Sequence, residues 1–182
     1  IYVAELNREQ NHLQLNRYNA TTGDFDKTLF EETDSRYVEP QHPVMFVPNH
    51  PDRFVWQSRR DGYNHLYLYD ISGKLLKQLT HGEWEVTEVT GFDAKGENLF
   101  FESTRPTPMD RHLHAIHLNS GQMKLLTTES GMHSSTISIS GKYLIDRFSS
   151  SDNPGKIALI DIKNSKTTLL NSVKNPFQEY NI

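Results

Sequence analysis

Cysteine is absent from all 182 residues of the sequence. Disulfide bonds, thiol catalysis and cysteine-based zinc sites are therefore excluded for this chain, while the redox compartment stays open. Runs of basic residues are missing as well, because 19 Lys and Arg are interspersed with 23 Asp and Glu and the formal net charge is −4. A surface that binds nucleic acid or anionic lipid needs a stripe of basic side chains, so we expect neither partner.

Long hydrophobic runs and targeting signals are also missing. No stretch approaches the ~18 consecutive apolar residues of a transmembrane helix, so we expect no membrane insertion. The sequence starts at Ile1 rather than at Met, and it shows no signal peptide. We therefore expect both ends to lie within a longer protein.

The sequence also lacks a nucleophile motif. The pentapeptide Gly-x-Ser-x-Gly, which exposes the reactive serine of an α/β-hydrolase on a strained turn, does not occur. Ser134 and Ser135 lie next to His133 in the sequence, but no acid, base and oxyanion hole stand in register with them. We interpret these residues as part of a strand and expect no catalytic residue in this chain, which on its own is not an enzyme.

An internal repeat is the strongest feature that the sequence does contain. Residues 49–58, 94–103 and 140–146 each lead from a turn into an apolar strand that ends in polar residues. The first strand residues of these segments are 45 and 44 positions apart, and residues 2–5 fit as an earlier, truncated copy. A unit of ~40–50 residues that repeats in this way is typical of the blades of a β-propeller.

A second repeated element follows each of these strands. It is a strand that ends in Asn or Asp, then a tight turn, then another strand. The residues at the turn are Asn19, Asp70, Asn119 and Asp161, the first three with Gly close behind. Asn, Asp and Gly suit hairpin turns because they tolerate a positive φ and because Asn and Asp bond to their own backbone.

These patterns predict an all-β fold of about four blades, each with four antiparallel strands, from a larger and eight-bladed propeller. The predicted blades cover residues 1–33, 34–84, 85–130 and 131–175, and the first lacks its innermost strand. An irregular β-sandwich is the alternative, but it does not explain the regular spacing. Four open blades leave a sheet edge or face unsatisfied, so pairing with a second copy and closure into a four-bladed ring both stay open.

Several segments resemble the propeller of the dipeptidyl peptidase IV family, in order and with compatible spacing. Residues 54–67 are similar to its strand, Asp-Gly turn and His-Leu-Tyr strand, and residues 78–86 to its Leu-Thr-x-Gly-x-Trp-Glu-Val segment. Three further segments resemble the same family in matching order: residues 6–13, 111–113 and 140–143. The bacterial members of the family are the most similar. Each motif alone is common in propellers, whereas the ordered set is specific.

The resemblance implies a two-domain serine exopeptidase. In such enzymes an eight-bladed N-terminal propeller covers a C-terminal α/β-hydrolase domain with a Ser-Asp-His triad, and dipeptides with Pro or Ala in second place are released from peptide N-termini. This chain would be the second half of the propeller, without the hydrolase domain, and would gate access and scaffold the active site. No cofactor is implied. The resemblance also implies a periplasmic or secreted location.

Four residues stand out as structural parts of these motifs. Asp61, Gly62 and His65 flank a tight turn, where we expect hydrogen bonds that stabilise the turn. We expect Trp84 to anchor the packing of a blade, because an indole buries a large apolar surface; stacking against a ligand is the alternative.

Tyr37 and Glu39 are the candidates for contact with substrate. They lie in a Pro-rich segment, residues 36–43, that is predicted to link two blades. The resemblance implies that this stretch approaches the cavity between propeller and hydrolase. Mammalian-type members carry an aromatic residue and an arginine near this place, and this sequence has no matching arginine.

Two further groups invite a functional assignment that we do not make. The resemblance implies that a pair of glutamates binds the substrate's amine, but the family's pair lies upstream of the region matched here. Glu31-Glu32 instead ends the last strand of a blade, where strand alternation sends the two carboxylates to opposite faces. We expect it to be a solvated strand end. His112 and His114 share a strand face without a carboxylate at ligand spacing, so we expect surface or cavity-lining histidines and no metal site.

Two other functions stay open at this stage. A free-standing propeller could bind a protein or a glycan with no enzyme attached, because propellers serve many functions. An acylaminoacyl peptidase or prolyl oligopeptidase relative would share the blades, but usually not the Gly-x-Trp-Glu-Val segment present at residues 82–86.

Overall fold

The fold is described for residues 1–176 by a computed structural model, and its regular elements there are fifteen β-strands with no helix. The strands form one three-stranded and three four-stranded sheets, all antiparallel. The chain divides into two compact units, residues 1–83 and residues 84–182, and each holds two of the sheets. The all-β prediction is confirmed.

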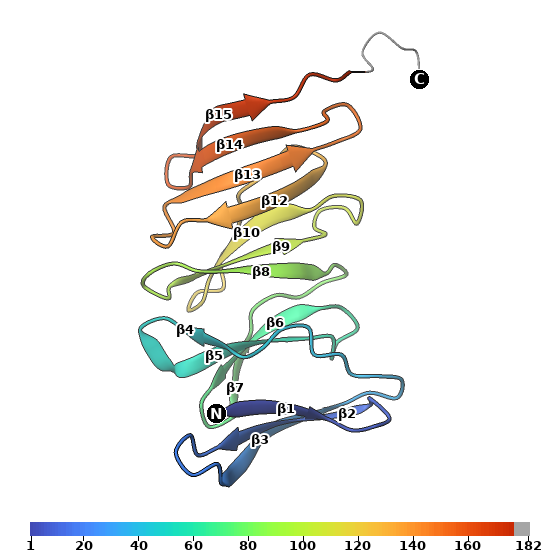
Figure 1. The fold of residues 1–182 in the computed structure, drawn as a ribbon, viewed down its shortest axis with the longest axis vertical. Coiled ribbons are helices and arrows are strands. Elements are labelled where there is room, and N and C mark those ends of the chain that lie inside the picture. The colour runs from blue at the N-terminus through green and yellow to red at the C-terminus, as the bar shows by residue number, and fades with distance from the viewer. Residues whose placement is uncertain (177–182) are drawn as a thin grey trace. The chain divides into compact units, whose positions relative to one another are not determined.

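The first unit contains the first and second sheets (Figure 1). The first sheet consists of β1 (Tyr2–Leu6), β2 (His12–Tyr18) and β3 (Phe25–Thr33). The second sheet consists of β4 (Met45–Val47), β5 (His50–Ser58), β6 (His65–Asp70) and β7 (Leu75–Gln78). In both sheets the spatial order of the strands is the order in the sequence, as in a meander.

The second unit contains the third and fourth sheets. The third sheet consists of β8 (Val86–Phe92), β9 (Asn98–Ser103), β10 (His112–His117) and β11 (Met123–Leu125). The fourth sheet consists of β12 (Met132–Ile137), β13 (Tyr143–Ser149), β14 (Lys156–Asp161) and β15 (Lys166–Ser172). Each sheet lies inside one of the predicted blade ranges, and the limits of the blades between the sheets stay a prediction.

The repeated apolar strands occupy equivalent positions in the sheets. β5, β9 and β13 are each the second strand of a four-stranded sheet, and β1 takes the matching place with no strand before it. The prediction that the first blade lacks its innermost strand is therefore confirmed within the described residues.

The predicted hairpin turns form as their residue types require. Asp70 Oδ1 accepts hydrogen bonds from the backbone N–H groups of Ser72 and Lys74, at 2.8 and 3.1 Å. The side chains of Asn19 and Asp161 likewise accept from the backbone N–H groups two and three positions further along the chain. Gly73 has φ 89°, and a Cβ atom there would lie 2.1 Å from the carbonyl oxygen of Leu29, so only glycine fits this turn against β3.

Each unit has its own hydrophobic core. In the first unit a core of aliphatic and aromatic side chains fills the space between the first and second sheets: Leu13, Leu15, Leu29, Phe54, Trp56, Tyr67 and Tyr69. In the second unit Phe100, Leu113 and Leu144 form the centre of a smaller core between the third and fourth sheets. Within each unit the two sheets thus pack face to face, as blades do.

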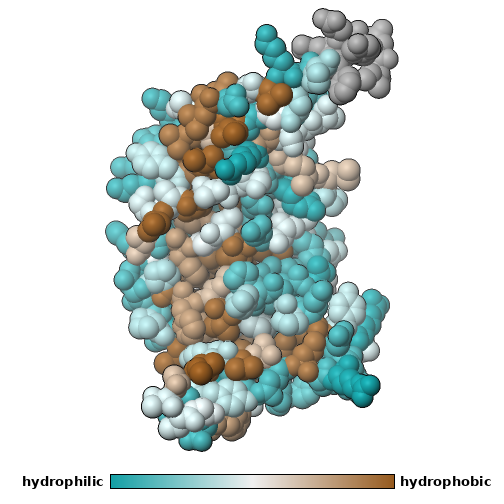
Figure 2. Space-filling model, in the orientation of Figure 1, coloured by the Kyte–Doolittle hydropathy of each residue, from teal (hydrophilic) through white to brown (hydrophobic). Residues whose placement is uncertain are grey.

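The fourth sheet carries apolar side chains that nothing in the described chain covers. Tyr143 and Ile145 of β13 are 45% and 37% exposed, whereas Leu144 between them is buried. Figure 2 shows hydrophobic side chains at the surface over the region that Figure 1 labels β13–β15. The alternation on β13 therefore gives this sheet two apolar faces, of which one is open.

Candidate functional site

A small pocket in the first unit collects the predicted substrate-contacting residues. Its volume is about 190 Å³, and it lies between the end of β3, the loop that follows and the turn between β5 and β6. We call it the Tyr37 pocket. Its lining residues are Glu31, Glu32, Thr33, Asp34, Tyr37, Val38, Glu39, Arg59 and Arg60.

Glu32 forms the floor of the Tyr37 pocket and is not a solvated strand end. Its side chain is 10% exposed. Oε1 accepts a hydrogen bond from the indole N–H of Trp56 at 2.7 Å, and Oε2 accepts one from the Ser58 hydroxyl at 2.8 Å. The expectation of a solvated end was wrong because β3 packs its final residues against β5, which offers these donors.

Arg60 balances the charge of Glu32. Its guanidinium forms an ion pair with Glu32 and donates to the hydroxyl of Tyr69 at 2.5 Å. The Arg60 Cζ atom also lies 4.4 Å from the centre of the Tyr67 ring, a cation–π distance. Burial acts to lower the pKa of Arg60, but Glu32 and Tyr69 outweigh burial and the net pKa is raised, so the group stays charged.

The two glutamates have separate hydrogen-bond partners. Glu31 Oε2 pairs with the His12 ring at 2.6 Å, and Oε1 accepts from Gln14 at 3.2 Å. Both partners lie on β2, whereas Glu32 contacts β5 and the turn after it. The prediction that alternation separates the two carboxylates is confirmed by these contacts.

Tyr37 and Glu39 lie on an exposed loop that is fixed at two backbone positions. The N–H of Val38 donates to the carbonyl of Gln10 at 2.7 Å, and the N–H of Asp34 donates to that of Asn11 at 3.0 Å. The Val38 side chain packs against the core of the first unit, which leaves Tyr37 57% exposed. The anchored loop therefore presents both side chains next to Arg60.

No arginine near Tyr37 in the sequence matches the one that the mammalian-type members carry there. The guanidinium groups of the pocket come instead from Arg59 and Arg60, in the turn after β5. Only the packing of the first sheet on the second brings that turn and the loop together, so no local sequence signal could have indicated it.

Gly62 closes the tight turn, whereas Asp61 and His65 bond to residues outside it. Gly62 has φ 98°, and its N–H donates to the carbonyl of Arg59 at 2.9 Å. Asp61 Oδ2 accepts from the side chain of Gln78 at 2.6 Å. The fully buried His65 ring lies 3.1 Å from the Thr80 hydroxyl and 2.9 Å from the carbonyl oxygen of Gly82. These contacts join β6 to the segment after β7.

Trp84 packs in the second unit and does not line the Tyr37 pocket. It is half-buried, and its ring stacks on Phe101 and His114 with centroids 6.3 and 6.4 Å apart. These contacts agree with the expected packing role. That Asp61, Gly62, His65 and Trp84 have a structural role and do not contact a ligand stays a prediction.

His112 and His114 of β10 are buried, so of the two expected placements, at the surface or lining a cavity, the surface one is wrong. His112 and His114 are each 2% exposed. The His112 Nδ1 atom lies 3.0 Å from the carbonyl oxygen of Thr127, and the His114 Nδ1 atom lies 3.2 Å from the Ser103 hydroxyl. Burial lowers the pKa of His114 to about 4, so this ring is neutral at pH 7. Among residues 1–176, no three His, Asp or Glu side chains are grouped to hold a metal ion.

Ser135, Asp146 and His133 form a buried network whose geometry differs from that of a catalytic triad. Asp146 stands between the other two, accepting from Ser135 at 3.1 Å and pairing with His133 Nδ1 at 2.7 Å. The second nitrogen of His133 lies 2.7 Å from the carbonyl oxygen of Glu129. A triad needs the histidine to face the serine, so the interpretation of these residues as strand structure agrees with the contacts.

A family profile described as the dipeptidyl peptidase IV N-terminal region matches residues 1–155. The chain belongs to this family. The acylaminoacyl peptidase and prolyl oligopeptidase alternatives are thereby set aside. In the part of the chain that the structure describes, no helix is long and apolar enough to cross a membrane.

Relatives and solved structures of this family match most of the chain. A protein of Arthroderma gypseum named as a dipeptidyl-aminopeptidase B is 31% identical over 137 residues, which are 69% of this chain and 15% of that protein. A Bacteroides ovatus structure assigned as a dipeptidyl aminopeptidase IV has a TM-score of 0.89 at 37% identity, over 98% of this chain and 28% of that one. Porphyromonas gingivalis dipeptidyl peptidase 4 has a TM-score of 0.82 at 28% identity, over 94% and 24%.

The four sheets are therefore blades of a β-propeller like that of the matched structures. The chain spans between 15% and 28% of the length of these relatives. Its residues correspond to part of the N-terminal region of such peptidases.

Proposed function

We propose that this chain is the non-catalytic propeller part of a serine exopeptidase that releases X-Pro and X-Ala dipeptides from peptide N-termini. The observation that carries the proposal is the match of residues 1–155 to the N-terminal region of dipeptidyl peptidase IV. The names of the relatives, dipeptidyl-aminopeptidase B and dipeptidyl peptidase 4, support the reaction class.

In this proposal the propeller gates substrate access and supports a hydrolase domain outside the chain. Acyl transfer by a serine needs a nucleophile, a base and an oxyanion hole held in one geometry. Ser135, two residues after His133 in the sequence, donates its hydroxyl to Asp146 instead of facing the histidine. The 182-residue chain alone is expected to release no dipeptide.

The Tyr37 pocket is the proposed point of contact with the peptide. Tyr37 offers an exposed ring for packing and a hydroxyl, and Glu39 offers an exposed carboxylate. Beneath them, Glu32 and Arg60 are already bonded to each other and to their neighbours, so they hold the floor of the pocket in place. Fixed polar groups around a small concave site are typical of ligand recognition.

The test is kinetic and uses the complete parent protein with dipeptidyl chromogenic substrates and longer X-Pro peptides. We expect Tyr37→Ala and Glu39→Gln to raise KM for the longer peptides by on the order of 3–10-fold with little change in kcat, as when a binding contact is lost. Glu83→Gln removes the same charge at an exposed position outside the pocket and serves as the control.

Two results would contradict the proposal. If the parent protein releases no dipeptide, or if the reading frame stops soon after Ile182, a free-standing binding module takes the place of the peptidase. If dipeptides are released but both variants match the control, the peptidase stands and the Tyr37 pocket is not its contact site.

Location and assembly belong to the same proposal. We propose a periplasmic or secreted location for the parent protein and a homodimer as its assembly. Fractionation of the native host and sedimentation of the purified parent protein test the two statements separately.

A further inference from the structure

The ring of His133 is held between two acceptors inside the second unit. Its Nδ1 atom lies 2.7 Å from Asp146 Oδ2, and its Nε2 atom lies 2.7 Å from the carbonyl oxygen of Glu129. His133 and Asp146 are each 4% exposed. A neutral imidazole has one N–H group and serves one of these acceptors, whereas an imidazolium has two and serves both. The contacts therefore fit a protonated ring.

A second buried carboxylate lies next to this pair. The Ser135 hydroxyl donates to Asp146 Oδ1 at 3.1 Å, and the Ser135 N–H donates to Glu102 Oε1 at 2.8 Å. Glu102 belongs to β9 of the third sheet and is 8% exposed, whereas Ser135 belongs to β12 of the fourth sheet. Two buried carboxylates thus approach one serine, and the positive charge of His133 compensates part of their negative charge.

Other titratable groups surround His133 on the elements packed against it. They are His112 of β10, Asp110 before β10, Glu129 before β12, Lys156 of β14 and Glu88 of β8. The His112 ring lies 5.0 Å from that of His133, centroid to centroid. The Glu129 carboxylate forms an ion pair with Lys156. Asp146 is thus the charged group in direct contact with the His133 ring.

His133 also lies where the backbones of the third and fourth sheets meet. The N–H of Arg111 donates to the carbonyl of Gly131 at 3.0 Å, and the N–H of His133 donates to the carbonyl of Arg111 at 3.1 Å. Residues 126–131 connect β11 to β12, and we call them the second link. Because the carbonyl of Glu129 belongs to this link, the His133 ring joins the link to the fourth sheet.

We propose that His133 is a pH-sensitive switch that controls the contact between the third and fourth sheets. With a proton on both nitrogens, the ring bonds Asp146 and the carbonyl of Glu129 and holds the second link in place. After the loss of one proton, a ring nitrogen without hydrogen faces an acceptor at 2.7 Å. Asp146 and Glu102 then lose the compensating charge. Both changes favour release of the link, because buried polar groups and charges without partners are costly.

The direction of the switch follows from the proton balance of His133. Burial acts to lower the pKa of His133, but the hydrogen bonds to Asp146 and Glu129 outweigh burial and raise the pKa above 6.5. A raised pKa means that the folded contact binds the proton more tightly than the open one. The contact is therefore closed below pH 6.5, and it opens as pH rises through the raised value.

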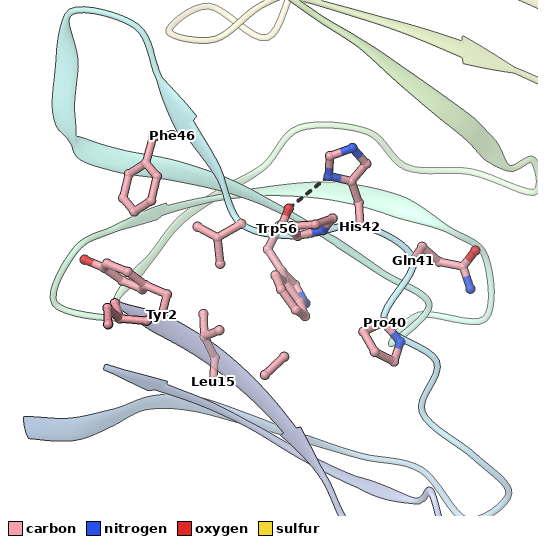
Figure 3. Close-up of a pocket in the computed structure, with 11 residues that line it drawn as sticks. Tyr2, Leu15, Pro40, Gln41, His42, Phe46 and Trp56 are labelled. Atoms are coloured by element: carbon pink, nitrogen blue, oxygen red, sulfur yellow. Dashed lines mark hydrogen bonds between the residues drawn. The ribbon is translucent and has the colours of Figure 1, made fainter. Parts of the chain in front are cut away.

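The first unit supplies a matched comparison. Residues 34–44 connect β3 to β4 in the same way, and Figure 3 shows the part of this connection that lines a pocket beside Leu15 and Trp56. The histidine of this segment, His42, has its Nδ1 atom 3.0 Å from the carbonyl oxygen of Pro43. Within residues 1–176 the His42 ring forms no ion pair. Proton loss from His42 should therefore leave its segment in place.

The test follows the 182-residue chain by NMR across the range in which a histidine with a raised pKa titrates, about pH 5.5 to 9. The ring signals of His133 give its protonation midpoint, and amide hydrogen exchange at Arg111, His133 and Ser135 reports the contact between the sheets. After correction for the intrinsic rise of exchange with pH, we expect the protection of these amides to fall by about tenfold to a hundredfold, the effect of one hydrogen bond to a charged group. The fall should share its midpoint with His133.

An amide elsewhere in the third sheet separates local opening from unfolding. The N–H of Leu118 donates to the carbonyl of Glu97 at 2.9 Å, and Leu118 is buried. Its protection should stay constant while that of Arg111, His133 and Ser135 falls.

Three variants assign the effect to the His133 proton. His133→Gln keeps an amide donor but cannot titrate, so the protection should no longer depend on pH. His42→Gln is the matched control and should keep the wild-type profile. Asp146→Asn removes the negative charge beside the ring, so it should lower the His133 midpoint and move the opening to lower pH by the same amount. A residue that only fills space would not shift this midpoint.

Three outcomes would overturn the inference. The first is protection at Arg111, His133 and Ser135 that stays constant while the wild-type His133 ring titrates, a result that needs no variant. The second is an equal fall at Leu118, which would indicate global unfolding. The third is a His133→Gln variant that keeps the wild-type dependence on pH, which would assign the opening to another group.

Discussion

The Glu32 carboxylate accepts hydrogen bonds from three groups on β5 and the turn after it: the Trp56 indole, the Ser58 hydroxyl and the Arg60 guanidinium. The Glu32 side chain is 10% exposed and is paired with a half-buried arginine. Removing the charge of Glu32 should therefore lower the stability of the fold, because the positive charge of Arg60 is then left without compensation. Strand alternation predicted that Glu31 and Glu32 point to opposite faces, but not that Glu32 is buried. The partners could not be predicted, because they lie 24 or more positions further along the chain.

Glu32→Gln should destabilise the 182-residue chain by about 2–3 kcal/mol, between the values for exposed and for fully buried pairs. Chemical denaturation followed by circular dichroism measures the change. Glu31→Gln is the control one residue away, since its side chain is 49% exposed and the loss of its charge should destabilise the chain much less. Equal effects of the two substitutions would contradict the structural role given to Glu32.

The buried histidines predict a stability optimum in pH. Both ring nitrogens of His133 face acceptors, Asp146 and the carbonyl of Glu129. Burial acts to lower its pKa, but these hydrogen bonds outweigh burial and raise the pKa above the ordinary 6.5. A raised pKa stabilises the fold fully below pH 6.5, and this contribution is lost as pH rises through the raised value. Glu102, whose pKa burial also raises, acts in the same direction.

His114 acts in the opposite direction. Its pKa is lowered to about 4, so the folded state resists a proton that the unfolded chain accepts. Stability should therefore fall by on the order of 3 kcal/mol as pH drops from 6.5 to 4. Melting temperatures from pH 4 to 8.5 measure both slopes. His114→Gln should flatten the acid slope and His133→Gln the alkaline one, and variants that keep the wild-type slopes would refute the assignment.

Among the elements, the hairpin turns show how closely local sequence determines structure. Asp70 and Gly73 were predicted to form a turn from residue type alone, and they do. The sequence did not indicate that the turn also packs against β3, where a Cβ atom at Gly73 would meet the backbone of Leu29. Propensity for a turn is local, whereas the approach of another sheet depends on the whole unit.

Two glycine substitutions separate these contributions. Gly62→Ala should destabilise the chain by about 1–2 kcal/mol, because the backbone has a positive φ of 98° there while an added Cβ atom meets no other atom. Gly73→Ala has a similar φ of 89° and also the clash with Leu29, which adds about 1–3 kcal/mol. Urea denaturation should rank Gly73→Ala as the more harmful of the two. The reverse order would show that the turn does not pack on β3 in solution.

For the whole molecule, the number and kind of the sheets were predictable because each blade repeats one local pattern. The repeat gave the place of β1 as a second strand, and the ordered motifs gave the family. The Tyr37 pocket was predictable only in part, since Tyr37 and Glu39 lie in one recognisable segment but Arg59 and Arg60 reach the pocket from a different sheet. Contacts between sheets leave no periodic trace in the sequence.

The open face of the fourth sheet has a consequence for the isolated chain. Met132, Tyr143 and Ile145 share this face and are each more than a third exposed. Uncovered apolar surface of this kind favours association.

We expect sedimentation to show concentration-dependent association of the 182-residue chain. The variant Ile145→Lys should shift this equilibrium toward the monomer, because a lysine on this face must lose water to enter an interface. Thr21→Lys adds the same charge at an exposed hairpin turn in the first unit and should associate like the wild type. A chain that stays monomeric at all concentrations, or an Ile145→Lys variant that associates as strongly as the control, would mean that this face is not an association surface.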